Sequence, residues 1–394
     1  MAFKIPSLSE VNRNVENGFS KAFYGTSGVL RVTFIKILSK VVAGAVYIVV
    51  LLLAAMWKNF FSETADVDGL VNIASKYQMS PKPASRARGR VVVTGAAGSS
   101  VAAGTVLVEP VTGKEYEVLA SVSIANGATT ATAQVYAFEF GQEYNLDAST
   151  TLQFRDATPN GVTAVAVDSE GIYGGRSVQV TVNGVVKAWG ESIEEFRARV
   201  RKREQNSPQG GSDADYWRWA MSFSEVSNCW VVPNGWSVTN LVAIFCADFN
   251  SSSISLNSTI LDDVRQYILS NNRRPATSIP VIGTVTPIKV GLTVLIPVLN
   301  DYYKNSVLSA VKAYFTDLGP GKSFSAESIR QYILGKGVDR ASISEVLIGG
   351  KYQSGSYTLK KYLMGTNYTN YTVEGEVVNV NTIGDNITFM QMSS

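Results

Sequence analysis

Three pairs of neighbouring carboxylates have the residue type that acid–base chemistry needs: Glu194/Glu195, Asp213/Asp215 and Asp262/Asp263. A glycoside hydrolase uses two carboxylates that face each other across a cleft. The members of each pair here lie side by side on a predicted helix or in a linker, where carboxylates are solvated or stabilise a helix N-terminus. We therefore predict no catalytic carboxylate pair.

The segment 318–323, Leu-Gly-Pro-Gly-Lys-Ser, resembles the end of a phosphate-binding loop. The complete motif has a glycine five residues before Gly321, where this chain has Thr316, and it follows a strand and begins a helix. Because a helix is predicted before this segment, we interpret it as a turn between two helices.

Histidine is absent, which excludes His-containing catalytic triads and histidine metal ligands. The two cysteines, Cys229 and Cys246, are too few for a four-cysteine zinc site. Their apolar neighbours favour two buried free thiols, and a structural disulfide is the alternative. The sequence therefore predicts no catalytic, cofactor-binding or metal-binding residue, and we do not expect an enzyme.

The composition indicates a large and weakly charged protein. The chain has 394 residues, of which 17% are charged and 45% are hydrophobic, and its net charge is +3. This length suggests several domains, and the many Gly, Ser, Thr and Val residues favour short strands and turns. The small net charge does not indicate nucleic acid as a partner.

The most apolar part of the chain is the run 41–57, which contains no charged residue. A membrane-spanning helix needs about 20 apolar residues, so this run is borderline in length. Lys40 and Lys58 flank it as they would at a bilayer boundary. The alternative is a helix buried between subunits, apolar on all sides because it has neighbours on all sides.

The order of helical and strand patterns predicts an α+β multidomain fold. A helical arm comes first, then a β-rich domain of sandwich or barrel-like type, then small α+β units and a β tail. The predicted segments are 1–82 for the arm and its helical bundle segment, 83–190 for the β-rich domain, 191–283 for an α+β domain, 284–350 for a second small α+β unit and 351–394 for the tail.

Apolar periodicity, capping residues and prolines set the expected elements. Residues 1–30 are expected to form an irregular or short-helical arm. Ser192 and Glu195 form a predicted capping box, and Thr259 is the expected N-cap of a later helix. The expected helices are 31–59, 67–77, 192–203, 213–221, 259–270, 306–317 and 325–334, and the expected strands include 90–94, 105–108, 116–119, 121–124, 131–136, 238–247 and 287–298.

Two groups of apolar and aromatic residues are candidates for protein interfaces. Aromatic residues are dense around 216–236, where they serve either core packing or interface anchoring. The predicted interface residues are Ile48, Leu51, Leu52 and Trp57 in the apolar run, and Tyr216, Trp217 and Trp219 in the aromatic segment.

A longer pattern combines a helix, a proline-containing joint, a strand entry and a later charged helix. Its residues are Thr64, Ala65, Leu70, Ala74, Pro83, Ala84, Ala87, Gly89, Val91, Gly95, Ala103, Gly104, Thr105, Gly113, Glu115, Tyr116, Glu117, Glu191, Ser192, Glu194, Glu195, Arg197, Arg199, Pro208, Gly210, Gly211, Asp215, Tyr216, Trp219 and Ala220. In this order and spacing, residues 60–350 resemble the baseplate J-like family of Mu- and P2-type contractile-tail phages. The more apolar run 41–57 and the tail after residue 349 depart from the family pattern.

The resemblance implies a structural baseplate wedge protein of the virion, assembled in the host cytoplasm around the tail tube, which relays host contact to sheath contraction. Its implied partners are other copies of itself, other wedge and hub proteins, and tail-fibre attachment proteins, with no nucleic acid, no cofactor and no membrane in the assembled state. The run 41–57 would then be a helix between subunits. The alternative is a single-span membrane-anchored protein with an extracytoplasmic β-rich domain.

Overall fold

The structure is a computed structural model that describes residues 5–25, 33–234, 236, 238–251, 253–270, 273, 275, 277–364 and 372–392. The chain divides into two compact units, which we describe separately. The first unit comprises Met1–Pro81, Val180–Lys187 and Ser192–Gln205, and the second comprises Lys82–Gln179, Ala188–Glu191 and Asn206–Ser394. Helices and sheets both contribute, so the predicted α+β class is confirmed.

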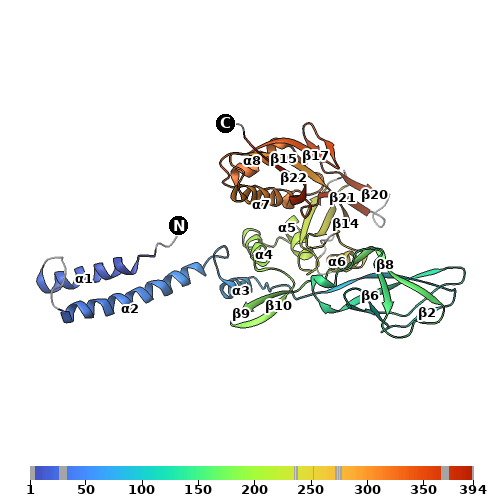
Figure 1. The fold of residues 1–394 in the computed structure, drawn as a ribbon, viewed down its shortest axis with the longest axis horizontal. Coiled ribbons are helices and arrows are strands. Elements are labelled where there is room, and N and C mark those ends of the chain that lie inside the picture. Colours follow the sequence, from blue (N-terminus) through green and yellow to red (C-terminus); the bar gives the residue numbers. More distant parts are fainter. Residues whose placement is uncertain are drawn as a thin grey trace. The chain divides into compact units, whose positions relative to one another are not determined.

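The first unit is mainly helical. Its helices are α1 (Leu8–Tyr24), α2 (Thr33–Lys58), α3 (Val67–Lys76) and α4 (Ile193–Gln205). It also includes the tip of a hairpin formed by β9 (Val178–Val182) and β10 (Val185–Trp189). Helices α1 and α2 pack against each other and run antiparallel as a helical hairpin (Figure 1).

Helix α1 is more regular than the arm expected for residues 1–30. It has 17 residues and starts with a capping box in which the Ser7 side chain accepts from the Glu10 amide and the Glu10 side chain accepts from the Ser7 amide. This reciprocal pair satisfies two amides that a helix start otherwise leaves free. Gly25 ends the helix in the left-handed conformation, with a φ of 70°.

The joint after α2 has the predicted form of a short helix followed by proline-containing extended chain. Asp66 is the N-cap of α3, and its side chain accepts a 2.8 Å hydrogen bond from the Gly69 amide. Leu70, Ile73 and Ala74 form the buried face of α3, at the spacing expected of an amphipathic helix.

The β-rich domain of the second unit is a closed barrel with the strand order β1-β6-β4-β3-β7-β8. Its strands β6 and β8 are labelled in Figure 1. Alternate residues of β1 are buried, including Val91 and Val93, because successive side chains of a strand point to opposite faces. The strands are β1 (Arg86–Gly95), β3 (Val106–Val108), β4 (Glu115–Val118), β6 (Thr130–Phe140), β7 (Thr151–Phe154) and β8 (Val162–Tyr173), with a small separate pair of β2 (Ser100–Val101) and β5 (Val122–Ser123).

After the barrel, the second unit continues with a mixed sheet that includes the order β11-β12-β14-β21-β20, with β13 paired to β12. Helices α5 and α6 pack against this sheet. The elements are α5 (Asp213–Ala220), β11 (Asn228–Pro233), β12 (Leu241–Asp248), β13 (Ile254–Ser255), α6 (Ser258–Leu269), β14 (Ile279–Ile288), β20 (Lys361–Met364) and β21 (Thr372–Val378).

A further sheet has the order β18-β17-β15-β22, and its core includes residues of helices α7 and α8. The elements are β15 (Val290–Ile296), α7 (Asp301–Asp317), β16 (Ser323–Phe324), α8 (Ala326–Gly335), β17 (Ser342–Ile348), β18 (Lys351–Tyr352), β19 (Tyr357–Thr358) and β22 (Ile387–Gln391). The expected tail 351–394 supplies β21 and β22, which pair in parallel with β14 and β15. Residue 283 lies inside β14, so the 283/284 boundary falls within a continuous strand.

Some predicted bounds are wrong in detail. The N-cap of α6 is Asn257 rather than Thr259, and its side chain also donates a 2.7 Å hydrogen bond to the Arg88 carbonyl of the barrel. The strand expected at 287–298 is β15, which is shorter, and the strand β14 before it was not predicted as a separate element. Pro280 and Pro287 lie inside β14 and interrupt its apolar pattern, so the sequence did not indicate a separate strand there.

Candidate assembly interface

The contact between α1 and α2 uses small and short side chains. Val11 and Ser20 on α1, and Ser39 and Ala43 on α2, are each at most 6% exposed. The Ser39 hydroxyl donates to the Lys36 carbonyl within its own helix, at 2.9 Å. Small residues let two helices approach closely, but they leave the larger apolar side chains of α2 outside the contact.

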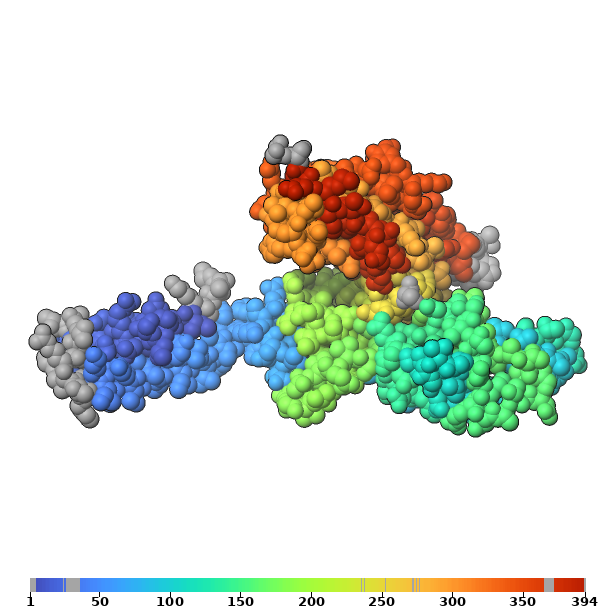
Figure 2. Space-filling view, in the orientation of Figure 1, coloured from blue at the N-terminus to red at the C-terminus, as the bar shows by residue number. Residues whose placement is uncertain are grey.

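The large apolar side chains of α2 are exposed. Ile48 and Leu52 are each 60% exposed, and Leu51 and Trp57 are each 42% exposed. The other exposed large residues of α2 and the turn after it are Ile37, Leu38, Val41, Val46, Val49, Leu53, Met56, Phe60 and Phe61. In Figure 2 the surface of this hairpin is blue. Exposed apolar patches of this extent mark interaction sites on proteins.

The segment Lys36–Lys58 of α2 is also long and apolar enough to cross a membrane, by length and composition alone. The exposed face of the hairpin therefore needs either a protein or a lipid environment.

A groove lies at the end of this apolar surface, between the last turns of α2 and the first turns of α3. Its volume is about 600 Å³, and both apolar and polar residues line it. The apolar lining residues are Leu52, Ala55, Met56, Phe60, Gly69 and Ile73, and the polar ones are Asn59, Asp66, Asp68, Asn72 and Lys76. Volumes of this size accommodate several side chains of a ligand.

Asn59 and Asp66 hold the two sides of the groove together. The Asn59 side chain accepts from the Asp66 amide and donates to the Asp66 carboxylate, both at 2.9 Å. The hydrogen bond from the Gly69 amide, then that from Asn59, hold the pKa of Asp66 below its ordinary value of 3.8, assisted by Lys58 and opposed by burial. A Cβ atom at position 69 would lie 2.5 Å from the Asn59 Oδ1 atom, so a larger residue there would have to displace the Asn59 side chain.

Helix α4 clamps the turn between α2 and α3. Arg197 Nη1 donates to the Ser62 carbonyl at 2.6 Å and to the Ala65 carbonyl at 2.9 Å. Ser62 and Ala65 are 4% and 2% exposed, so these carbonyls lie away from solvent. Glu194 accepts from Arg197 Nε at 3.2 Å and orients the guanidinium. We call this set of contacts around Arg197 the α4 clamp.

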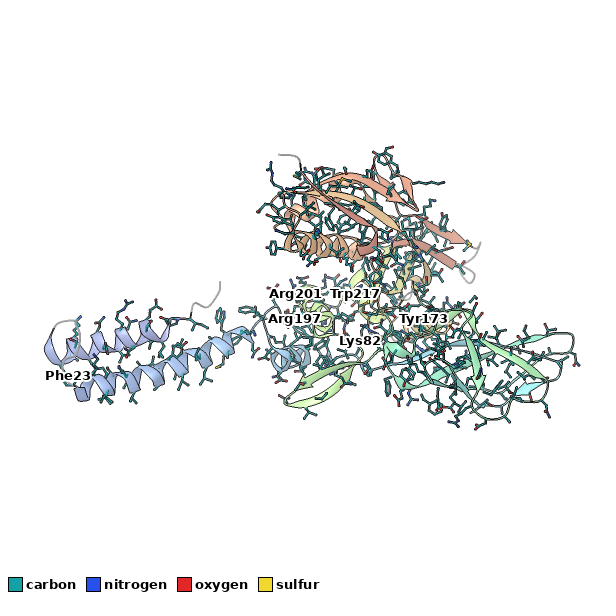
Figure 3. All side chains as sticks on the ribbon, viewed as in Figure 1. Phe23, Lys82, Tyr173, Arg197, Arg201 and Trp217 are labelled. Atoms are coloured by element: carbon teal, nitrogen blue, oxygen red, sulfur yellow. The ribbon has the colours of Figure 1, made fainter. Side chains whose placement is uncertain are left out.

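Three further arginines of α4 contact the chain near the same joint, and Figure 3 labels one of them, Arg201, beside Arg197. The ion pair between Arg201 and Glu63 is 2.8 Å long, and Arg199 Nη2 donates to the Ser80 carbonyl at 3.0 Å. The Arg203 guanidinium lies 5.4 Å from the centre of the Tyr77 ring. These arginines therefore bind the chain on both sides of α3 within the first unit.

The predicted interface residues in the aromatic segment lie in the second unit. Tyr216 is 1% exposed and donates a 2.7 Å hydrogen bond to the Ser278 hydroxyl. Its interpretation as an interface anchor is wrong, because the side chain is buried in the core of its own domain. Trp217 and Trp219 are half-buried against the same core, and Trp219 contacts Tyr216 edge to face at 5.1 Å.

Each of the three carboxylate pairs has a structural partner. Asp215 accepts from the Gln209 and Gly211 amides at 3.0 Å and closes the start of α5. Burial alone would raise the pKa of Asp215, but these amides and Ser212 outweigh it and lower the pKa. The remaining charge pairs are Glu194 with Arg197, Asp262 with Arg265 and Asp263 with Arg88.

The other chemical candidates take structural places as well. Cys229 and Cys246 are buried, form no disulfide, and lie opposite each other in the β11–β12 pair. The Gly-Pro-Gly-Lys segment is a turn after α7, and Gly321 adopts a φ of 83° there. Within the described ranges, no group of three or more His, Cys, Asp or Glu residues could hold a metal ion.

Sequence reasoning found the apolar run but missed the groove and the α4 clamp. Ser62 and Arg197 are separated by 135 positions, and nothing local to either residue indicates that they meet. The family resemblance placed the Glu194, Glu195 and Arg197 pattern and the joint in one series of motifs, but it did not indicate that they meet.

Comparison with known proteins identifies two domains. The family model described as the baseplate J-like protein barrel domain matches residues 90–175, which cover most of the barrel. The model described as the baseplate J-like central domain matches residues 208–282, which include α5, α6 and the start of the mixed sheet.

Two relatives are similar over long stretches of sequence. Baseplate protein gp47 of Escherichia phage Mu is 24% identical over 349 residues, which cover 85% of this chain and 91% of that protein. Mu-like prophage FluMu protein gp47 of Haemophilus influenzae is 27% identical over 230 residues, covering 58% of this chain and 59% of that protein.

A cryo-EM structure of the anti-feeding prophage baseplate contains a chain that aligns over 95% of this chain and 99% of its own length. The sequence identity is 10% and the TM-score is 0.37. A likeness at this level supports no inference about the protein.

Proposed function

The chain belongs to the baseplate J-like family and is a structural protein of a phage tail baseplate, and from this premise we propose that it is a wedge subunit. In this role it assembles in the host cytoplasm with copies of itself and with other wedge and hub proteins, and candidate neighbours include tail-fibre attachment proteins. We further propose that the assembled subunit relays host contact to sheath contraction by repacking between two discrete arrangements.

The observation that carries the proposal is the exposed apolar surface of α2. Side chains such as Val41, at 64% exposed, and Met56, at 59% exposed, lie uncovered on a helix that already packs on α1. Burying them against another protein removes apolar area from water, which is the main favourable term in stable association. The groove between α2 and α3 extends this surface with a concave end.

Helix α1 favours a protein over a lipid environment for α2. It runs beside α2 and carries Glu10, Arg13, Glu16 and Lys21. A bilayer that enclosed α2 in this hairpin would also have to accommodate these charges, and each charged side chain at the bilayer centre costs about 2.5 kcal/mol or more. Next to protein neighbours, the same charges can remain at the rim of the assembly.

The membrane-anchored alternative keeps one observation in its favour, which is the length and composition of Lys36–Lys58. Flotation of the purified chain with phosphatidylcholine vesicles distinguishes the two functions. We expect the chain to stay in the dense fractions. If it rises with the vesicles and needs detergent to remain soluble, the wedge proposal fails.

A substitution in the apolar surface tests the wedge proposal directly. Leu52→Glu places a charge on the exposed face of α2, and we expect the chain to be lost from tail particles while the barrel stays folded. Asn14→Glu on α1 adds the same charge at an exposed helical position and should leave incorporation unchanged. Electron microscopy and immunoblotting of particles measure the outcome. Normal incorporation of the Leu52→Glu chain would contradict the role of α2.

A further inference from the structure

The two cysteines of the chain occupy directly opposed positions in the mixed sheet. Cys229 on β11 and Cys246 on β12 are partners in the antiparallel register. Both side chains belong to the core that α6 covers, whereas their neighbours Trp230 and Phe245 belong to the core on the other side of the sheet. Because successive side chains of a strand point to opposite faces, the two thiols lie on one face with no residue between them.

The hydrogen-bond pattern shows which kind of pair the cysteines form. The Asn234 amide donates to the carbonyl of the opposed Leu241 at 2.8 Å. Hydrogen-bonded and non-hydrogen-bonded pairs alternate along an antiparallel ladder, so Pro233, which has no amide hydrogen, and Cys229 both fall in non-hydrogen-bonded pairs. In agreement, the Cys229 amide donates to Asn228 Oδ1 at 2.9 Å rather than across to β12.

A non-hydrogen-bonded pair brings the two backbones close enough for a disulfide. Its Cα atoms lie about 4.5 Å apart, and its side chains approach each other more closely than those of a hydrogen-bonded pair. Disulfides join residues whose Cα atoms are about 4.4–6.8 Å apart. The two strands therefore need no change of register and no large backbone movement to be linked.

We propose that Cys229 and Cys246 are a redox-dependent cross-link. In a reducing compartment they remain two thiols, and in an oxidising one they join as a disulfide across β11 and β12. The link forms within one chain, because the core on this face encloses both side chains. This inference does not rest on the proposed function and holds for the chain in any assembly.

A small disulfide such as oxidised glutathione supplies the oxidant. The Cys229 thiolate, on the edge strand of the sheet, attacks one glutathione sulfur, forms a mixed disulfide and releases one glutathione thiolate. The Cys246 thiolate then attacks the Cys229 sulfur, closes the cross-strand bond and releases the second glutathione thiolate. The protons of the two cysteine thiols pass through water to the released thiolates, so one disulfide is reduced as the other forms.

Local opening of β11 controls the rate of this exchange. Cys229 is 4% exposed and Cys246 is 1% exposed, so a reagent reaches them only when the edge strand opens. The exchange is therefore slow on the timescale of a short thiol assay and complete only after long equilibration.

The cross-link would fix the strand that joins the mixed sheet to the end of α7. Asn228 Nδ2 donates to the Thr316 carbonyl at 2.7 Å. A Cβ atom at position 319 would lie 2.5 Å from Trp230 Cδ1, so the turn at Gly319 packs closely on β11. A disulfide that closes the loop 229–246 restricts the open states of this hairpin and so keeps β11 in place.

Peptide mapping of the full-length chain tests the cross-link. We would equilibrate chain purified with reductant in a buffer of equal reduced and oxidised glutathione, trap the remaining thiols with N-ethylmaleimide, and analyse an unreduced digest by mass spectrometry. We expect the peptide that joins Cys229 to Cys246 within one chain as the main product. Glutathione adducts, unlinked cysteines or links between chains as the main product would overturn the proposal.

Cys229→Ala/Val231→Cys is the matched control. It keeps two thiols on the same face of the same two strands, because Val231 packs against the same core, but it moves one thiol to the diagonal position, about 7–8 Å from its partner. We expect at least about tenfold less cross-linked peptide than in wild type, because this separation exceeds the span of a disulfide. Equal yields from the two chains would refute the geometric argument.

Hydrogen exchange of the wild-type chain measures the effect without any substitution. Exchange of the Asn234 amide, which lies inside the loop that the disulfide closes, should slow at least about tenfold on oxidation. The Leu146 amide of the barrel, which donates to the Ile172 carbonyl at 2.7 Å, should exchange equally in both forms. An oxidised chain with unchanged exchange at Asn234 would show that the link does not fix β11 and would overturn that part of the proposal.

Discussion

Removing the Arg197 guanidinium should open the joint between α2 and α3. Arg197→Met keeps most of the unbranched stem and deletes the charged donors, so packing along the stem changes little. The substitution leaves the carbonyls of Ser62 and Ala65 without their 2.6 Å and 2.9 Å hydrogen bonds. Both residues are at most 4% exposed, so water replaces the lost donor poorly.

The size of the effect follows from the two bonds. A hydrogen bond from a charged group contributes about 1.5–3 kcal/mol, and a buried acceptor left without a partner costs about 1–3 kcal/mol. Because the two bonds share one guanidinium and the loop can relax, we expect the local opening free energy of the joint to fall by about 2–4 kcal/mol. The lower end of this range corresponds to roughly thirtyfold faster opening-limited amide exchange.

Arg201→Met is the matched control. It makes the same chemical change one turn further along α4, at an ion pair with Glu63 whose side chains are 45% and 64% exposed. Surface pairs of this kind contribute about 0–1 kcal/mol, so amide exchange in the joint should change little.

Hydrogen exchange of the full-length chain is the appropriate assay, because it reports local opening rather than global unfolding. The informative amide is that of Leu70, which donates at 2.8 Å to the Asp66 carbonyl in the first turn of α3. Exchange there should accelerate in Arg197→Met and not in Arg201→Met, while the barrel stays protected in both. Equal protection at Leu70 in the two variants would refute the reasoning that the α4 clamp stabilises the joint.

Three further predictions concern the second unit. The pKa of Asp215 is lowered in the folded state, so its carboxylate stabilises the fold above the ordinary pKa of 3.8, and this stabilisation is lost as pH falls through the folded value. Asp215→Asn should therefore have a lower free energy of unfolding than wild type at neutral pH. Denaturation measured at a series of acidic pH values should show the difference between the two proteins becoming smaller as pH falls. Arg88→Gln leaves Glu225, 12% exposed and 3.0 Å from the lost guanidinium, as a poorly compensated buried charge, and thermal denaturation should show a loss of about 3 kcal/mol. Cys229 and Cys246 should not react with Ellman's reagent in the native chain and should give two thiols after denaturation, whereas no reactive thiol after denaturation would indicate a disulfide.

Local signals in the sequence were sufficient for many elements. The helix 325–334 matches α8, because Ser325 is a strong N-cap and the apolar spacing is regular. The length of α1 was underestimated, although Ser7 and Glu10 form a recognisable capping box and Leu8, Val11, Val15 and Phe19 follow helical spacing. The signal was present, and the many polar residues of this segment obscured it.

Long-range pairing is where sequence reasoning stopped. The barrel order places β1 between β6 and β8, and no local pattern specifies that neighbourhood. The same holds for the tail, where β21 pairs with β14 in the register Thr284 to Glu374. The five-segment division of the chain remains a proposal, because strands from the expected tail complete sheets that begin well before it.

The interface candidates in the apolar run are exposed in this chain, but the sequence did not indicate that Tyr216 is buried. A long run without charged residues, such as 41–57 with Ile48 and Leu52, can be recognised from the sequence, because apolarity is a property of each residue. Aromatic density misassigned Tyr216, because a tyrosine serves equally well in a core when its hydroxyl finds a partner such as Ser278. Burial depends on neighbours, and single residues do not encode it.

The α4 clamp explains why two distant sequence patterns occur in the same chain. Ser192 and Glu195 start α4 through reciprocal hydrogen bonds of 2.7 Å and 3.2 Å, which sets the helix in place. Glu194 then orients Arg197 toward the turn after α2, and Arg199 binds the chain beyond α3. The charged helix motif and the proline-containing joint are therefore two halves of one structure in the first unit. An arm that contacts other subunits through α2 needs such a fixed base, because a freely hinged arm would lose conformational entropy on every assembly contact.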